Sequence, residues 1–277
     1  MKTNFKTFLF LSFLTVIFVL AGGMIGGQQG AVIAFVLALV MNFISYWFSD
    51  TIVLKRYAAR EVVREDNSRL YFIVEKLAAE AGLPMPKVYI VPGSTPNAFA
   101  TGRDPSHAAI AATEGILQIL NDQELAGVMA HELTHVKNRD TLIGTVAASI
   151  AGAITLLGQM GRYGTSSNSR NPLILIAVLL FPIAALLIRM AISRVREYAA
   201  DEGGAEISGQ PLGLASALNK LHHGVKLNPI TRGTPADSHL FIVNPFLGGV
   251  QSLLSTHPPV EERIRRLEQM AGGVRPS

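Results

Sequence analysis

Cysteine is absent from the 277 residues of this sequence. Disulfide bonds are therefore excluded, and so are the zinc sites in which cysteine thiolates supply the ligands. A metal site in this chain would have to use histidine imidazoles and the carboxylates of Asp or Glu.

Charge is also scarce, since charged residues make up 16% of the chain against about 25% in a typical soluble domain. No charged residue occurs between Lys6 and Asp50. The net charge of +4 is not gathered into one long basic block, which argues against nucleic-acid binding. The composition favours a membrane protein, and we therefore expect the lipid bilayer to be one of its partners.

The uncharged N-terminal stretch is too long for one membrane span and is interrupted by glycines between residues 22 and 30. We expect two membrane helices, Phe8–Ile25 and Ala31–Phe48, so that residues 1–49 form a transmembrane hairpin. Basic residues lie before and after this hairpin, and the positive-inside rule places both of its ends in the cytoplasm. The alternative for the first helix is a cleaved signal peptide.

A second apolar region covers residues 141–190. It contains two uncharged runs, Thr141–Met160 and Pro172–Ile188, separated by a loop rich in glycine, serine and asparagine. Basic residues are more frequent outside this pair than in its loop, so we expect a second transmembrane hairpin with cytoplasmic flanks. The alternative is a hairpin buried inside the soluble part of the protein.

The motif His131-Glu132-Leu133-Thr134-His135 lies in a segment with helical character. Residues four apart share one helix face, so the two imidazoles are placed as two ligands of one metal ion. A zinc ion would lower the pKa of a bound water towards ~7, and Glu132 would take its proton during attack on a peptide carbonyl. The alternative is a polar helix face with two solvated histidines, but the neighbouring apolar residues indicate a buried helix.

A catalytic zinc ion of this kind takes three protein ligands and leaves one position open. Glu197 is the best candidate for the third ligand, because it opens the first helix after the second hairpin. Asp201 lies one turn further on the same face and could orient a ligand histidine or an arginine. Glu202 and Glu206 lie about 140° and 180° around the helix from Glu197, so they fit less well. The alternative is a solvated face, in which case neither Glu197 nor Asp201 has a role.

The remaining soluble parts, residues 50–140 and 191–277, predict a small sheet over the H-E-x-x-H helix. The predicted elements before that helix are a helix over Arg60–Ala81, strands over Lys87–Val91, Asn97–Gly102 and Ala108–Ala112, and a short helix over Glu114–Leu120. Three further helices are predicted to start near Glu197, Leu212 and Glu261.

Two further sites are suggested by their positions. The residues Asn97, Ala98, Phe99, Ala100 and Thr101 are expected to form the edge strand of the cleft, to which a polypeptide substrate would add as a further strand. They could equally form an ordinary hairpin strand. His257 precedes two prolines and could polarise the oxyanion of the reaction, or could be a simple turn residue.

With these motifs the chain resembles the HtpX-type membrane zinc metalloproteases, relatives of the CAAX prenyl proteases. The resemblance rests on N-A-F-A-T-G at 97–102, H-E-L-T-H at 131–135, E-Y-A-A-D at 197–201, and S-T-H-P-P at 255–259 with Arg263-Ile264 beyond. It implies an endopeptidase of the bacterial inner membrane with a cytoplasmic active site. It also implies a role in stress response and quality control, with misfolded or damaged membrane proteins as substrates, and it is compatible with self-cleavage.

Taken together, these observations predict a mainly α membrane protein with four transmembrane helices and a cytoplasmic zincin-like α+β metalloprotease domain. The expected units are the first hairpin at 1–49, the part with the H-E-x-x-H helix at 50–140, the second hairpin at 141–190, and the part with the third ligand at 191–277. One Zn²⁺ per chain is expected, with both termini in the cytoplasm. The rival function is a membrane scaffold or transporter-like protein with a structural metal or none. This rival is less well supported, because a structural zinc site needs no general base and usually has four protein ligands.

Overall fold

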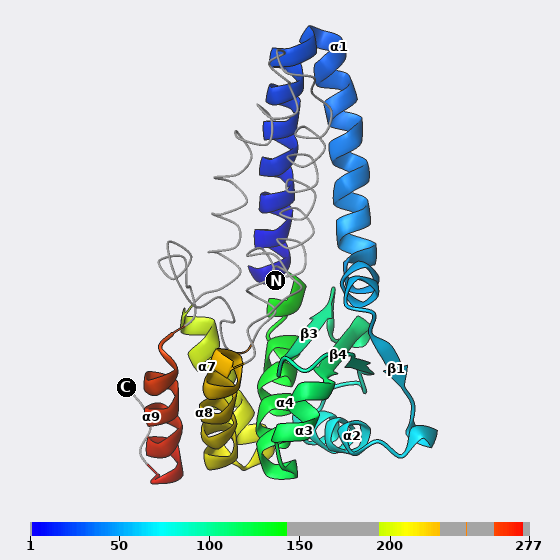
Figure 1. Ribbon diagram of the computed structural model, residues 1–277. Coiled ribbons are helices and arrows are strands. Elements are labelled where there is room, and N and C mark those ends of the chain that lie inside the picture. Colours follow the sequence, from blue (N-terminus) through cyan, green and yellow to red (C-terminus); the bar gives the residue numbers. More distant parts are fainter. Residues whose placement is uncertain (1, 143–193, 228–241, 243–257, 274–277) are drawn as a thin grey trace.

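The N-terminal apolar stretch forms the helix α1, Lys2–Arg56, in a computed structural model that describes residues 2–142, 194–227, 242 and 258–273. Two residues inside it, Gly26 and Gly27, have non-helical backbone angles, and Gly27 has a φ of +58° that glycine adopts without steric cost. The chain reverses there, so that the two arms of α1 run side by side as a hairpin (Figure 1).

One polar contact joins the arms of α1 in otherwise apolar surroundings. The side-chain amide of Asn42 donates to Thr15 Oγ1 at 2.9 Å and to the carbonyl oxygen of Leu11 at 3.2 Å. In an apolar medium such an interhelical hydrogen bond fixes how two helices face each other. It therefore sets the rotation of the second arm against the first.

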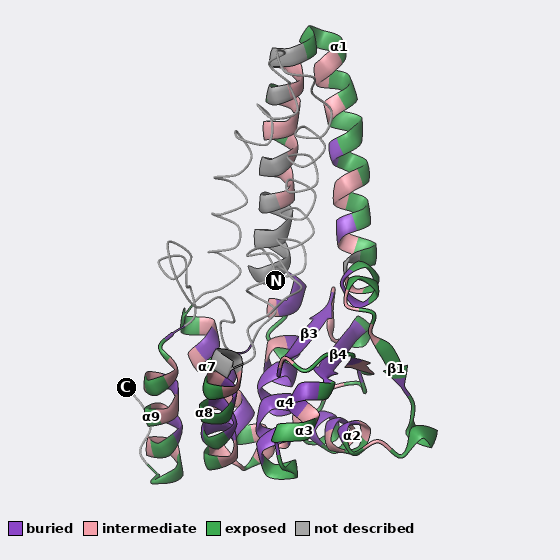
Figure 2. Ribbon diagram, in the orientation of Figure 1, coloured by how far each residue is buried: buried purple, intermediate pink, exposed green. Residues whose placement is uncertain are grey.

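The second arm has the length and composition of a membrane span. Within the described residues, Gly26–Phe48 is the single candidate, with a mean hydropathy of 2.1. Its large apolar side chains are mostly exposed (Figure 2), among them Val32, Ile33, Phe35, Leu37, Val40 and Phe43. An exposed apolar surface of this extent fits contact with lipid.

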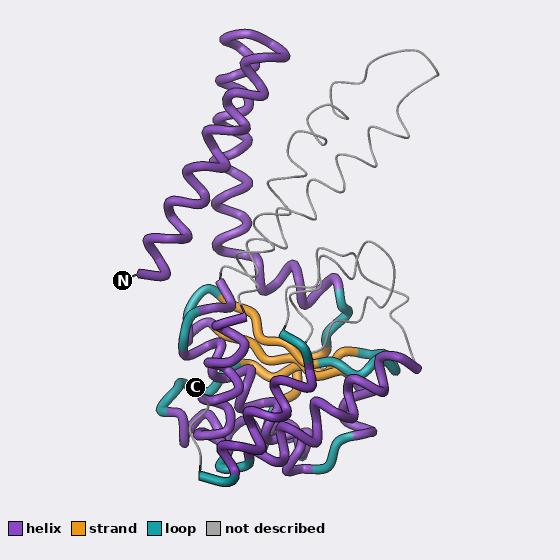
Figure 3. The backbone as a smooth tube through the Cα atoms, turned by 90° about the vertical axis from the view of Figure 1, so that its left-hand side faces the viewer, coloured by secondary structure: helices purple, strands orange, loops and turns teal. Residues whose placement is uncertain are grey.

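Below the hairpin lies a four-stranded sheet of β1 (Arg60–Val62), β2 (Lys87–Val91), β3 (Ala98–Gly102) and β4 (Ala108–Thr113). The strand order is β1-β2-β4-β3, in which β2 and β4 are parallel and the other pairs are antiparallel. The strand β3 therefore lies at one edge of the sheet. The sheet separates the end of α1 from the other helices (Figure 3).

Both faces of β3 and β4 are buried, and alternate residues contact different layers. On one face Phe99, Ala109 and Ala111 pack against Val53 and Leu54, in the last turns of α1. On the other face the alternate residues of both strands join the main core with the helices, including Ala98, Ala100, Ala108, Ile110 and Ala112. The small alanine side chains allow helices to approach the sheet closely on both sides.

The prediction of one helix over Arg60–Ala81 is wrong in its first part. That part forms β1 and the 3₁₀ turn η1, Arg64–Asp66, and the helix α2 is confined to Arg69–Ala81. The backbone of β1 pairs with β2 and buries Val62. The turn is closed by Asp66, whose side chain accepts the N–H of Val63 at 2.9 Å, and by Asn67 with a left-handed φ of 52°. In this first part of the segment, the turn bonds and the strand pairing are preferred over the helix that the side-chain pattern predicts.

The helix α4, Asp122–Lys137, lies at the centre of the domain and packs against α2, α7, α8 and β3. Its N-terminus is closed by reciprocal bonds between Asn121 and Glu124. The other helices among the described residues are the short α3 (Glu114–Ile119), α7 (Arg194–Ser208), α8 (Pro211–Leu227) and α9 (Val260–Ala271), and η2 (Pro105–His107) is a second 3₁₀ turn.

The expected combination of a largely helical chain, a membrane helix and a sheet domain is confirmed. The predicted second hairpin at 141–190 lies outside the described residues except for Thr141 and Leu142, which are buried. The hydroxyl of Thr141 donates to the carbonyl oxygen of Gly102 at 3.0 Å. The chain therefore leaves the described part of the domain beside the end of β3.

Candidate metal centre

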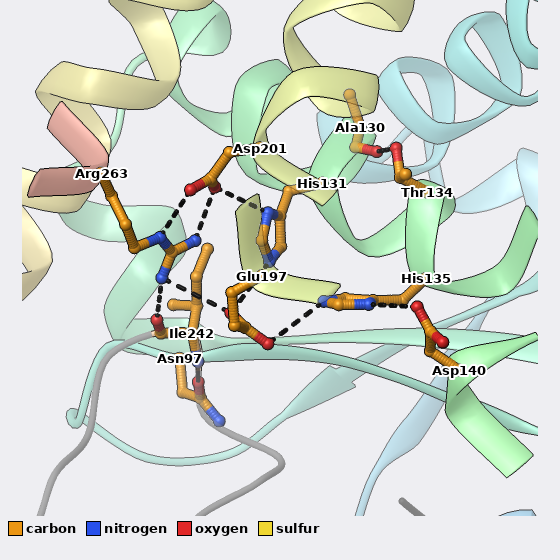
Figure 4. Close-up of polar contacts among 10 residues, drawn as sticks. All are labelled: Asn97, Ala130, His131, Thr134, His135, Asp140, Glu197, Asp201, Ile242 and Arg263. Atoms are coloured by element: carbon orange, nitrogen blue, oxygen red, sulfur yellow. Dashed lines mark hydrogen bonds and ion pairs between the residues drawn. The ribbon is translucent and has the colours of Figure 1, made fainter. Parts of the chain in front are cut away.

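Three side chains that could ligate a metal converge between α4 and α7. The ligand atoms of His131, His135 and Glu197 all lie within 4.8 Å of one another. The Nε2 atom of His131 is 3.8 Å from Glu197 Oε2, and that of His135 is 3.7 Å from Glu197 Oε1 (Figure 4). Both histidines thus point the same ring nitrogen at one carboxylate.

These donors fit a zinc ion. Imidazole nitrogens and a carboxylate oxygen are ligands that zinc takes, with bonds of about 2.0–2.2 Å. A tetrahedral ion with such bonds keeps its ligand atoms roughly 3.4 Å apart. The two histidine–carboxylate separations of 3.8 and 3.7 Å are within a few tenths of an ångström of this value, whereas the widest separation in the group, up to 4.8 Å, would have to shrink by about 1.4 Å. His131 and Glu197 are also buried, where an unpartnered polar group is costly.

The close crossing of α4 and α7 brings Glu197 to the histidines. A Cβ atom added to Gly204 would lie 2.8 Å from the backbone nitrogen of His131, nearer than such atoms approach in proteins. Glycine at this position therefore lets the backbones of the two helices nearly touch. Asp201 and Glu197 lie about one and two turns earlier on α7, respectively, and both point towards the histidines of α4.

Two buried charged residues, Asp201 and Arg263, lie in series on the Nδ1 side of His131. Its Nδ1 atom lies 3.0 Å from Asp201 Oδ1. Asp201 in turn accepts two bonds from Arg263 of α9, at 2.8 Å from Nε and 2.7 Å from Nη2. Burial would raise the pKa of Asp201, but the Arg263 guanidinium and His131 outweigh it and hold this pKa below its usual range. Asp201 therefore stays ionised and can orient the imidazole.

Arg263 also reaches the third candidate ligand. Its side chain is buried, and its Nη1 atom lies 3.7 Å from Glu197 Oε2 and donates to the carbonyl oxygen of Ile242 at 2.8 Å. The backbone N–H of Ile242 donates to Asn97 Oδ1 at 3.3 Å. These bonds link α9, α7 and the residue before β3 around the site.

His135 has a carboxylate partner of its own. Its Nδ1 atom lies 3.3 Å from Asp140 Oδ2, and Asp140 Oδ1 lies 3.4 Å from Nε of Arg196. Burial would lower the pKa of His135, but the hydrogen bond with Asp140 and the negative charges of Glu197 and Glu132 raise it to about 9. In the metal-free protein His135 therefore binds its proton tightly.

Glu132 lies beside the edge strand. It is buried, and its carboxylate accepts a hydrogen bond from the backbone N–H of Ala100 in β3. Burial raises the pKa of Glu132, although the neighbouring histidines act in the opposite direction. A carboxylate with a raised pKa next to a metal site has the properties of a general base.

The structure brings five of the residues proposed from the sequence into one site, namely His131, Glu132, His135, Glu197 and Asp201. The edge strand β3 beside this site contains four of the proposed substrate-strand residues, Ala98 to Thr101. The fifth, Asn97, immediately precedes the strand. His257 lies outside the described residues. Glu202 and Glu206 are less buried and are not among the grouped donors.

Two residues of the site, Asp140 and Arg196, were not assigned a role from the sequence, and Arg263 was quoted only as part of a motif, without a role. Asp140 follows the H-E-x-x-H helix closely and Arg196 immediately precedes Glu197. Their positions beside motif residues are a usable signal, but no periodic pattern marks them.

The family comparison covers this whole site. A family model described as Peptidase family M48 matches residues 64–271. A protein named Protease HtpX homolog from Pyrococcus furiosus is 54% identical over 275 residues, which cover 96% of this chain and 95% of that protein. A protein of the same name from Syntrophotalea carbinolica is 53% identical, over 96% of this chain and 98% of that protein. Another from Sulfurihydrogenibium sp. is 51% identical, over 100% of this chain and 99% of that protein.

Among solved structures, the crystal structure of S. mikatae Ste24p is similar with a TM-score of 0.54 and 18% identity, over 96% of this chain and 66% of that one. This likeness concerns the fold alone. The sequence matches are closer and extend over nearly the full length of the chain, and they confirm the resemblance seen in its motifs. The chain belongs to peptidase family M48, among the HtpX-type membrane metalloproteases.

Proposed function

We propose that this protein is a zinc-dependent endopeptidase, a metalloendopeptidase of class EC 3.4.24.-, that cleaves misfolded or damaged membrane proteins. One Zn²⁺ per chain would be held by His131, His135 and Glu197. The observation that carries the proposal is the convergence of these three donors from α4 and α7 beside a buried Glu132. A structural metal site would have no use for that fourth group.

Zinc bound there would supply a Lewis acid that polarises a peptide carbonyl and makes water acidic. The residues of the chain have separate tasks around it. The Asp201 carboxylate, 3.0 Å from His131 Nδ1, favours a proton on that nitrogen and would leave the lone pair of Nε2 for the metal. Glu132 takes a proton from the attacking water and later passes it to the leaving amine, and the N–H of Ala100 holds its carboxylate in place.

Unfolded polypeptide would bind along β3, at residues Asn97 to Thr101. The strand pairs with β4 on one side and lies at the sheet edge on the other. A substrate that adds to this edge is held by main-chain hydrogen bonds, which read little sequence. That mode of binding suits a protease for damaged proteins of many sequences.

The proposed location is the cytoplasmic (inner) membrane of a bacterial cell, with four spans and with the active site and both termini in the cytoplasm. The apolar surface of the second arm of α1 supports one of these spans. The basic residues Lys55 and Arg56 follow it in the last turn of α1, on the side where the domain lies. Positive charge next to a span favours the cytoplasmic side.

The test uses the full chain in detergent with a casein-like substrate. Glu132→Gln keeps the shape of the side chain but removes the base, so we expect full zinc content and peptidase activity reduced by about 10²–10⁴-fold. Glu197→Ala should lose both zinc and activity, whereas the neighbouring Glu202→Ala serves as a matched control and should keep both. Casein cleavage by Glu132→Gln at the wild-type rate would refute the peptidase and favour the membrane scaffold.

A further inference from the structure

We propose that Asp140 and Arg196 are positioning residues that hold His135 for metal binding and join the two ends of the segment 143–193. This inference rests on the proposed zinc site, because His135 is one of its ligands. Neither residue touches the candidate ligand atoms directly. Both would act through the imidazole of His135.

The two histidines are held in matching ways from opposite sides. Each uses Nε2 towards Glu197 and Nδ1 towards an aspartate, and each aspartate contacts an arginine. For His131 these partners are Asp201 and Arg263. Asp140 and Arg196 occupy the same two positions relative to His135. The repetition of the arrangement at both imidazoles points to a shared purpose, which is to fix the ring and its tautomer.

The backbone places Asp140 at this position by an unusual turn. The helix α4 ends at Lys137 with Asn138 as its C-cap, and Arg139 then adopts a φ of +59°. Non-glycine residues rarely adopt this left-handed conformation, which has an energetic cost. The turn directs the chain back so that the Asp140 side chain meets His135 on the last turn of α4. The contact is therefore built into the end of the helix.

The pair also joins distant parts of the chain. Asp140 lies just before the segment 143–193, and Arg196 lies just after it. Their contact at 3.4 Å connects the residue that leaves α4 with the first turn of α7. Their side chains are 15% and 22% exposed, compared with 4% and 1% for Asp201 and Arg263. The half of the site around His135 is thus more open, and it depends on the two ends of this segment staying together.

The test measures zinc affinity by competition with a chelator on the full chain in detergent, and the visible absorption of the Co²⁺-substituted protein. Asp140→Ala should weaken zinc binding by about 10–100-fold and change the Co²⁺ bands, because the His135 ring loses its orientation. Asp140→Glu, which keeps the carboxylate, should recover part of the affinity. As a matched control, Glu75→Gln removes the Arg64–Glu75 ion pair at 3.0 Å, away from the site, and should change neither readout.

The link across the segment is tested by a double-mutant cycle. Arg196→Gln should weaken zinc binding in the wild-type chain but have little further effect once Asp140 is replaced by asparagine. The proposal would be overturned if both Asp140→Asn and Arg196→Gln bind zinc within twofold of the wild-type affinity and leave the Co²⁺ bands unchanged. This outcome can be read even if Asp140→Ala does not fold. Fully additive effects would overturn the link between the two ends. These readouts need no turnover, so they separate this proposal from that of the peptidase.

Discussion

Individual buried carboxylates in this domain are balanced by several partners each. Glu124 on α4 accepts the backbone N–H of Asn121 and bonds from Ser216 at 2.7 Å and Lys220 at 2.8 Å on α8. A buried carboxylate with fewer partners would cost stability. Burial would raise the pKa of Glu124, but Lys220 and the hydrogen bonds outweigh it and lower this pKa. Glu124 thus joins α4, the helix that carries His131 and His135, to α8.

This coupling predicts a pH-dependent loss of stability in Glu124→Gln. A lowered folded-state pKa means that the ionised Glu124 stabilises the protein above the usual glutamate pKa of about 4.3, and that this contribution is lost as pH falls through the folded-state pKa. We expect the variant to lose about 1–3 kcal/mol at pH 7. Thermal unfolding in detergent should show a lower Tm at pH 7 and a shrinking difference in acid. Glu268→Gln, on the exposed face of α9, should match wild type, and an equal deficit of Glu124→Gln at both pH values would contradict the coupling.

At this same scale the sequence predicted the three donors that the structure brings together, but it did not predict that Arg263 would contact Asp201. The spacing of His131 and His135 follows from helix geometry alone, so a local motif was enough to pair them. Arg263 meets Asp201 from 62 residues further along the chain. No local rule relates those two positions, because their contact depends on how α9 packs against α7.

At the scale of elements, the edge strand β3 is where the sheet meets α4, the helix with the H-E-x-x-H motif. The N–H of Ala100 points to Glu132 and away from β4. Backbone groups alternate in direction along an antiparallel strand, so the N–H of Ala98, two residues earlier, also faces the open edge. We propose that this N–H bonds the substrate, which would leave the bond from Ala100 to Glu132 in place.

Ala98→Pro tests this role of the strand. Proline removes one outward N–H and is tolerated on an edge strand where that group faces away from the sheet. We expect the KM for a casein-like substrate to rise several-fold, with kcat and zinc content close to wild type. Steady-state kinetics and metal analysis provide the measurement. An unchanged KM in a folded variant would show that substrates bind elsewhere.

Element prediction succeeded where a pattern was long or sharply bounded. The strand at Lys87–Val91 lies between proline signals and was located correctly. The three residues of β1 carry too little alternation to be told apart from the start of a helix, and their pairing with β2 is a tertiary effect. The extent of the sheet was therefore harder to predict than its centre.

For the whole molecule, the second arm of α1 is continuous with the soluble domain. It runs from the apolar span into the sheet through Val53 and Leu54. The Arg103 guanidinium, just after β3, lies 4.7 Å from the centre of the Trp47 ring, a distance that suits a cation–π contact. The end of the edge strand is thereby attached to the membrane-facing helix, which places the proposed substrate strand near the bilayer surface.

The topology predicts where a reporter fused after Ser277 will be active. In the topology that we propose, four spans would return the chain to its starting side, and the positive flanks favour the cytoplasm for that side. A fused green fluorescent protein should be fluorescent, and a fused alkaline phosphatase, which needs the periplasm, should be inactive. The converse pattern would require an odd number of spans or the opposite orientation.

The position of Arg263 late in the chain also bears on how the protein is synthesised. The ribosome completes α4 and α7 well before it reaches the arginine that neutralises Asp201 and lies beside Glu197. Until that moment, closing the domain would bury these carboxylates without their cation, which is strongly unfavourable. The nascent chain is itself an unfolded membrane polypeptide, the kind of molecule that we propose this enzyme cleaves. The proposed peptidase activity would therefore have to wait until Arg263, 62 residues after Asp201, has been synthesised.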